Sequence, residues 1–297
     1  MGLRLSLLAG CAPGNPAVDA PAVDVSLPTA DAAAACGEPP RVNPSPPAAP
    51  PYSGTVFIDP DLMTAADPTS FVGVVYKGQG QRTMFDRRTN SFNLVNAHLF
   101  DATFGASTRV EVQVNPEISR TDAEIEAARY ATVIGRMPAF LFRDLDTVWI
   151  HRGLNPFGGG NRNLLIHTEQ GAQYIADGFL EEVFLHEAAH TSLDAHHASA
   201  ADWVAAQAAD RGAISDYARD NPMREDVAES LGPYLAQRFW IDRMAAADIA
   251  KIRGAIPARI AYFDCLQLSA AARLPGSSVV ATRSSSDIAI VPPISGR

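Results

Sequence analysis

The stretch LHEAAHTSLDAHH, residues 185–197, holds four of the chain's seven histidines. His186 and His190 are four residues apart, with Glu187 directly after the first, in the spacing HExxH. Successive helical residues turn by about 100°, so the two imidazoles lie on one face, one turn apart, and can bind the same ion. Residues 183–193, VFLHEAAHTSL, contain no other charged side chain, which predicts a helix buried on most sides. Burying these polar groups without partners is costly, so the sequence predicts a metal site.

Zinc suits this donor set because it accepts imidazole nitrogens in tetrahedral geometry. A catalytic zinc site uses three protein ligands and leaves the fourth position to water. Glu187 follows the first ligand and is expected to lie beside that water, where a carboxylate can take up its proton. The motif therefore predicts a Zn²⁺ cofactor held by His186 and His190, with Glu187 as a general base.

Two candidates for the third ligand follow within the same stretch. His196 stands ten residues after His186, as in the pattern HExxHxxGxxH. However, Leu193 stands where that pattern has glycine, and a left-handed backbone there would cost leucine about 1–2 kcal/mol. We therefore expect the helix to run on through Leu193, which carries His196 about 9 Å beyond His190 along the axis. On such a helix Asp194 is expected to be a supporting or capping carboxylate.

The next candidates lie in NPMREDVAESLGPYLAQRF, residues 221–239. Asn221 followed by Pro222 predicts a helix start, and Pro233 is expected to kink or end its first part. Glu225 and Glu229 are four apart and share a face. A carboxylate from a second helix completes the His, His, Glu set of thermolysin-type sites, and the spacing allows either glutamate.

The motifs HEAAH, ISDYARDNP and EDVAES together resemble the catalytic domain of the anthrax lethal factor group of zinc peptidases. The resemblance covers roughly residues 180–240. It implies a zincin-like fold of the gluzincin type, with Glu225 as the third zinc ligand and Glu229 as a second carboxylate one turn on. It also implies that Tyr217 lies near the zinc and supports the substrate oxyanion.

The fold class expected from the whole chain is α+β, a small mixed sheet with an HExxH helix and a following helix that carries the third ligand. Period-two patterns predict early strands, and residues 121–137 predict a helix with Thr121 and Glu124 as a capping box. FGGGN (157–161) is expected to be a flexible turn, and His167 a satisfied strand histidine or a residue lining the cleft. The expected strands are TVFIDP (55–60), FVGVVYKG (71–78), RVEVQVNPE (109–117), DTVWIH (146–151) and NLLIHTEQGAQYI (163–175), and from Asp177 the sequence is expected to be helical.

The expected domains are a lipoprotein signal at 1–11, a Pro/Ala-rich linker at 12–51, a catalytic domain at 52–268 and a flexible tail at 269–297. Residues 52–115 are expected to form either a β-rich subdomain of the catalytic domain, a propeptide, or part of the same fold, and the sequence does not distinguish these three. MGLRLSLLAGC (1–11) resembles a lipoprotein signal with Cys11 as the lipidated residue, which predicts export and anchoring in the bacterial envelope, or an extracellular location. Cys36 and Cys265 then remain as an even pair that can form a disulfide or stay as separate thiols.

The net charge of −9 argues against a nucleic-acid partner. The function expected from the motifs is a zinc metallopeptidase that hydrolyses protein or peptide substrates by a zinc-activated water, with Glu187 as the base. The alternative is a non-catalytic zincin-fold envelope lipoprotein that serves as a binding or scaffold module, in which His196 or Glu229 occupies the water position and closes the metal site.

Overall fold

The computed structural model describes residues 39–57, 62–266 and 268. The expected signal at 1–11, with Cys11, the tail at 269–297 and Cys36 lie outside the described residues. Cys265, at the end of a helix that spans Pro257–Cys265, is disulfide-bonded. No helix in the described part of the chain has the length and apolar character needed to cross a bilayer.

A mixed sheet of six strands forms one half of the described structure, in the order β1-β2-β3-β4-β6-β5. β1, β2 and β3 are antiparallel neighbours, β4 lies parallel between β3 and β6, and β5 is an antiparallel edge strand beside β6. The strands are β1 (Phe71–Asp86), β2 (Ser91–Phe104), β3 (Thr108–Val114), β4 (Thr147–His151), β5 (Gly158–Gly160) and β6 (Asn163–His167).

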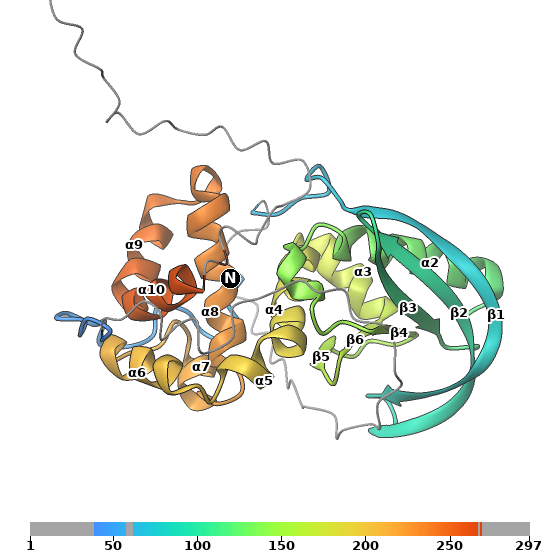
Figure 1. The fold of residues 1–297 in the computed structure, drawn as a ribbon, viewed down its shortest axis with the longest axis horizontal. Helices are drawn as coiled ribbons and strands as arrows, with labels where there is room; N and C mark the ends of the chain where they lie inside the picture. The colour runs from blue at the N-terminus through green and yellow to red at the C-terminus, as the bar shows by residue number, and fades with distance from the viewer. Residues whose placement is uncertain (1–38, 58–61, 267, 269–297) are drawn as a thin grey trace, which may run out of the picture.

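Helices cover one face of the sheet and make up the other half of the molecule (Figure 1). The described α-helices are α2 (Arg120–Ile134), α3 (Thr168–Asp177), α4 (Leu180–Ser192), α5 (Asp194–His197), α6 (Ala201–Asp210), α7 (Asp216–Asp220), α8 (Asp226–Phe239), α9 (Ala246–Ala255) and α10 (Pro257–Cys265). Two short 3₁₀ turns are also present: η1 (Ala139–Phe142) between α2 and β4, and η2 (Ile241–Arg243) between α8 and α9. The expected α+β class is confirmed.

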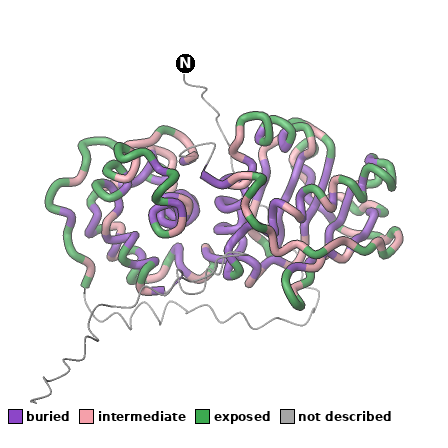
Figure 2. The backbone as a smooth tube through the Cα atoms, turned by 90° about the horizontal axis from the view of Figure 1, so that it is seen from above, coloured by how far each residue is buried: buried purple, intermediate pink, exposed green. Residues whose placement is uncertain are grey.

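The helix α4 lies between the sheet, with α2 and α3 against it, and the helices α6–α10, as Figure 1 shows. Alternate residues of β4 point to opposite faces, because side chains along a strand alternate. Val148 and Ile150 join the large apolar core under α2 and α4, whereas Trp149 packs with Leu165 and Met84 in a smaller cluster on the other face. Figure 2 shows buried positions running through the inside of both halves. The α4 helix is thus buried from both sides, as its apolar flanks predict.

Several expected elements differ from the structure in their bounds. The helix expected at 121–137 is α2, and its cap is Ser119, whose hydroxyl accepts a hydrogen bond from the Asp122 amide at 3.2 Å. The helix ends at Ile134 with Gly135 as its C-cap, so Pro138 is not the residue that ends it. The strand expected at 163–175 stops at His167, because Gln170, Gly171 and Tyr174 recur at helical spacing and turn inward as α3. Residues 55–57 form no strand, and 58–61 lie outside the described residues.

The glycine stretch FGGGN is not the flexible turn that the sequence suggested. Gly158, Gly159 and Gly160 form β5 and pair with β6, and the reversal falls on Asn161 and Arg162, both at positive φ. β5 packs on α4, and a Cβ placed on Gly159 would lie 1.8 Å from the Glu187 carbonyl oxygen. Glycine is needed here because any side chain would push the edge strand off the HExxH helix.

Part of the expected linker also lies against the folded body. The Asn43 amide donates to the Ala209 carbonyl at 2.7 Å, and Tyr52 forms a parallel β-bridge with Ser215. We call residues 43–57 the strap. Its backbone groups bond to Ala209 in α6, to Ile214 in the following loop and to Asp216 in α7, so the strap is part of the helical half.

We predict that Gly159→Ala destabilises the protein by roughly 1–3 kcal/mol, because the new methyl overlaps backbone atoms of α4 that no side-chain rotation can move. The measurement is urea unfolding followed by circular dichroism. Gly73→Ala in β1 is the matched control, because nothing lies within 4 Å of its added Cβ, and its effect should stay near 0.5 kcal/mol. Equal stabilities of the two variants would contradict the close packing of β5 on α4.

Candidate metal centre

Three donor atoms from α4 and the start of α8 meet in the interior. The Nε2 atoms of His186 and His190 are 3.1 Å apart, and Glu225 Oε2 lies 3.2 Å from His190 Nε2 and 3.6 Å from His186 Nε2. Zinc bonds of 2.0–2.1 Å in a tetrahedron separate the ligand atoms by about 3.3–3.4 Å. The three separations bracket that value, and among the described residues these three form the one cluster spaced to hold a metal ion.

Glu225 lies just before α8, and this helix begins later than the sequence predicted. Asn221 and Pro222 belong to a turn, in which the amides of Arg224 and Glu225 both donate to the Asn221 carbonyl, and α8 begins at Asp226. Pro233 lies inside α8 and does not end it. The turn presents Glu225 as the residue before the helix, and α8 packs on α4, so the carboxylate faces the two imidazoles.

The donors are almost fully buried, and their charges depend on one another. Glu225 is 1% exposed, and its Oε2 atom has no hydrogen bond. Burial alone would raise the pKa of Glu225, but the imidazoles of His186 and His190 hold it well below its usual range. Burial lowers the pKa of His190, and its neighbours Asp194 and Glu225 outweigh that effect and raise it. A buried carboxylate oxygen without a hydrogen bond, facing two imidazole nitrogens, fits a metal cation.

Each histidine has a second carboxylate behind it. His190 Nδ1 lies 2.7 Å from Asp194 Oδ2, and His186 Nδ1 lies 3.5 Å from Glu229 Oε1. These contacts leave both Nε2 atoms facing inward, which is the arrangement that orients imidazoles in metal sites. Burial raises the pKa of Glu229 to about 7.

The expected continuation of α4 through Leu193 is wrong in detail. The helix ends at Ser192, Leu193 adopts φ −117° and ψ −39°, and the separate turn α5 begins at Asp194. The break needs no left-handed residue, so leucine can occupy it. Asp194, four residues after His190, contacts its Nδ1 atom, while His196 Nε2 contacts Asp144 Oδ2 at 2.9 Å. His196 therefore lies outside the ligand cluster, as expected, although the continuous helix assumed for it does not form.

Tyr217 and Glu187 both lie beside the cluster. The Tyr217 hydroxyl donates to Glu225 Oε1 at 2.9 Å, so it bonds to the oxygen that does not face the histidines. Glu187 is 5% exposed, and its Oε2 atom is buried without a hydrogen bond. Burial lowers the pKa of His186, but the neighbouring carboxylates, Glu225 foremost, outweigh that effect and raise it. A buried carboxylate with an unbonded oxygen next to a cluster spaced to hold a metal ion is suited to taking up a proton.

Two groups that support the cluster were not found from the sequence. Glu229 Oε2 accepts hydrogen bonds from the Ser215 hydroxyl at 2.7 Å and from the Val56 backbone amide at 3.1 Å. Ser215 sits in the segment ISDYARDNP, where the serine two residues before Tyr217 was the available signal. Val56 contributes only its backbone, which no residue pattern reveals.

His167 lies outside the cluster, with His151 beside it. The two rings stack at 5.5 Å between centroids, His167 Nδ1 donates to the Arg152 carbonyl, and His151 Nδ1 bonds to the Asn115 amide group. Both are at the ends of adjacent parallel strands and are 0–1% exposed. Burial lowers the pKa of His167 and lowers that of His151 to about 4. This pair is a buried, neutral part of the sheet.

No family model matches the chain, and no curated protein or solved structure shows significant similarity to it.

We predict that His151 makes the protein less stable in acid. Its pKa is about 4 in the folded state and about 6.5 when unfolded, so between these values the unfolded chain binds more protons. The stabilising contribution of the neutral His151 imidazole to the free energy of unfolding is complete above about pH 6.5. It falls as the pH is lowered, by about 2 kcal/mol at pH 5.

The measurement compares urea unfolding of wild type and His151→Gln at pH 7 and pH 5. The difference between the two proteins isolates His151, since the remaining groups titrate in both. His196→Gln, at a partly exposed imidazole, is the control substitution. If wild type and His151→Gln lose equal stability between the two pH values, the buried imidazole is not the cause.

Proposed function

We propose that this protein is a zinc-dependent metallopeptidase. The observation that carries the proposal is the donor cluster of His186, His190 and Glu225, whose atoms stand 3.1–3.6 Å apart next to the unbonded carboxylate oxygen of Glu187. Three ligands and a neighbouring base are what metal-assisted hydrolysis of a peptide requires. The resemblance of the motifs to the lethal factor group, and hence a zincin-like fold, is part of this proposal.

His186, His190 and Glu225 would hold the ion. Zn²⁺ bound there would supply Lewis-acid chemistry, polarising a water molecule and the scissile carbonyl. Nitrogen and carboxylate donors of this kind are those that zinc prefers. Asp194 and Glu229 would keep the two imidazoles turned with Nε2 toward the ion.

Glu187 would take the proton of the attacking water and return it to the leaving amine. Its buried oxygen has no competing hydrogen bond, so no internal partner has to be displaced before proton transfer. Tyr217, whose hydroxyl now donates to Glu225 of the donor cluster, would donate instead to the developing oxyanion. The edge strand β5 packs on α4 at Glu187, so an extended substrate pairing with β5 would pass close to the base.

The non-catalytic alternative needs a fourth protein ligand in place of water. The two residues considered for that role have other partners. His196 contacts Asp144, and Glu229 bonds to Ser215 and Val56 while facing the outer nitrogen of His186. Their positions support an open coordination site and hence turnover.

Export and lipid anchoring at Cys11 remain proposals of the sequence, as does the bond from Cys265 to Cys36. The disulfide at Cys265 is consistent with an oxidising compartment outside the cytosol. A protein or peptide substrate is proposed on the same basis as the activity, and no nucleic-acid partner is proposed.

We predict that Glu187→Gln lowers kcat/KM on a broad peptide library by about 10²–10⁴-fold, because the amide cannot accept the water proton. Zinc content, measured by mass spectrometry of the purified protein, should equal that of wild type, since Glu187 is not one of the three clustered donors. Proteolysis at the wild-type rate in this variant would exclude Glu187 as the base. Wild-type protein that binds zinc but cleaves nothing would favour the scaffold alternative.

We also predict that Glu225→Ala weakens zinc binding by at least about 100-fold in a chelator competition. Loss of a direct ligand should cost no less than the 10–100-fold typical of a supporting carboxylate. His196→Ala is the matched control and should bind zinc as wild type does, because its imidazole pairs with Asp144. The opposite ranking of the two variants would assign the third ligand to His196.

A further inference from the structure

The strap runs alongside the segment that leads to Tyr217. The Tyr52 amide donates to the Ile214 carbonyl at 3.3 Å, and the Asp216 amide donates back to the Tyr52 carbonyl at 3.1 Å. The Tyr52 hydroxyl also donates to Asp248 at 3.0 Å. This two-way pairing fixes the register of the strap against the residues just before α7.

Asp216 holds the next two residues of the strap. Its Oδ2 atom accepts from the Ser53 hydroxyl at 3.0 Å, and its Oδ1 atom accepts from the Gly54 amide at 2.7 Å. Gly54 has φ +73°, a left-handed conformation that glycine adopts without strain. The turn at Gly54 redirects the chain inward, so that the Val56 amide enters the protein interior.

The Val56 amide then bonds to Glu229, the carboxylate behind His186. Glu229 Oε2 accepts from Val56 N at 3.1 Å and from the Ser215 hydroxyl at 2.7 Å, while Oε1 faces His186 Nδ1 at 3.5 Å. Glu229 and Ser215 are at most 1% exposed. Two donors on one oxygen fix the rotation of the carboxylate, and one of the two comes from the strap.

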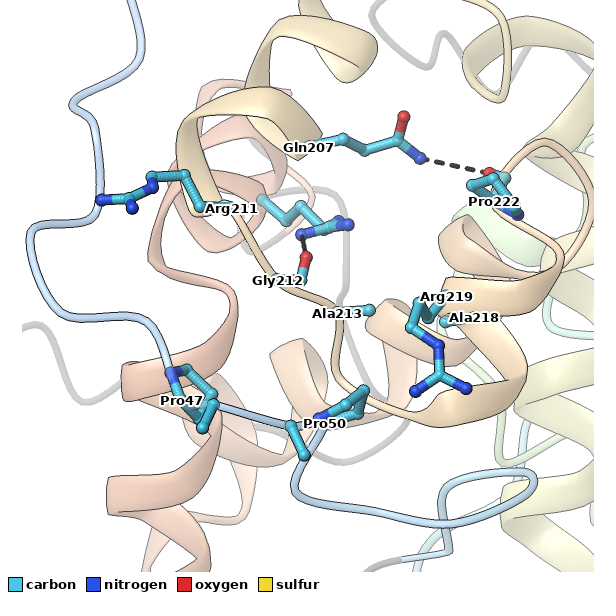
Figure 3. A pocket seen from close by; sticks show the side chains of 12 residues that line it. Pro47, Pro50, Gln207, Arg211, Gly212, Ala213, Ala218, Arg219 and Pro222 are labelled. Carbon is cyan, nitrogen blue, oxygen red and sulfur yellow. Dashed lines mark hydrogen bonds between the residues drawn. The ribbon is translucent and has the colours of Figure 1, made fainter.

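Between Asn43, which is buried and bonded to Ala209, and Tyr52, the strap borders a cavity. A cavity of about 360 Å³ lies beneath Pro47–Pro50 and is closed on the other side by residues of α6, α7 and their loop, among them Gln207, Arg211 and Arg219 (Figure 3). The firm contacts next to the metal centre are therefore those of residues 52–56, and the proline stretch behind them is loosely packed.

We infer that residues 52–56 are a positioning segment of the metal centre, which acts on His186 through Glu229. The inference rests on the proposed metal site and adds to it a part of the chain more than a hundred residues before the HExxH motif. Asp216 secures this segment, so it is a positioning residue that touches no metal ligand through its side chain.

The test is zinc affinity of the full-length protein by chelator competition. Asp216→Ala should weaken zinc binding by about tenfold, the lower range for loss of an outer-shell group. Asp220→Ala is the matched control, because Asp220 ends the same helix and its carboxylate bonds to the exposed Arg219. Asp216→Asn keeps one acceptor oxygen and should recover part of the affinity.

A double-mutant cycle separates positioning from general destabilisation. If the strap acts through Glu229, Asp216→Ala should have little further effect on zinc affinity in a Glu229→Gln background. Unfolding midpoints of the metal-free proteins report any loss of stability independently. If Asp216→Ala does not fold, Ser53→Ala removes one of the same contacts from the exposed side and should weaken zinc binding by a smaller factor.

The inference is overturned if Asp216→Ala and Ser53→Ala bind zinc as tightly as wild type, or if the effects of Asp216→Ala and Glu229→Gln simply add. Failure of the proposed function gives a different result, because wild type itself would then bind no zinc or cleave no peptide.

Discussion

The packing of α4 against α8 is the contact on which the rest of the structure depends. It buries two imidazoles and the carboxylates of Glu225 and Glu229 within a few ångströms of one another. Charged groups removed from water destabilise a protein unless each finds a partner. Each imidazole lies beside a carboxylate and each carboxylate beside an imidazole. The apolar core on both sides holds the two helices at the required separation. The surrounding elements can be understood as the support for that one polar contact.

The sequence predicted the local part of the site well, because helical spacing is a local property. His186, Glu187 and His190 follow from 3.6 residues per turn, and the absence of other charges around them predicted their burial. Glu225 is 35 residues beyond His190, so spacing alone left Glu229 equally possible, and only the resemblance selected between them. The structure distinguishes them by which nitrogen of His186 each one faces.

The parts that the sequence did not predict depend on tertiary contacts or on backbone groups. Three consecutive glycines have no hydrophobic periodicity, so the sequence does not distinguish β5 from a turn. The strand is recognised only from the tertiary contact of Gly159 with α4. The break at Leu193 involves an ordinary right-handed residue, and the helix start at Asp226 depends on a turn closed by the Asn221 carbonyl. Residues 43–51 of the strap fall in the predicted linker because of their proline and alanine content, whereas the strap is held by backbone groups and by side chains such as the hydroxyls of Tyr52 and Ser53.

The bond between Val56 and Glu229 also bears on the order of events in folding, because the two residues are 173 positions apart. Forming a contact of such separation costs loop-closure entropy before the contact contributes any stability. During synthesis, the HExxH helix emerges well before α8, and α8 must then meet a strap made much earlier. The proposed metal ion would meet its complete donor set of His186, His190 and Glu225 only after α8 has packed on α4.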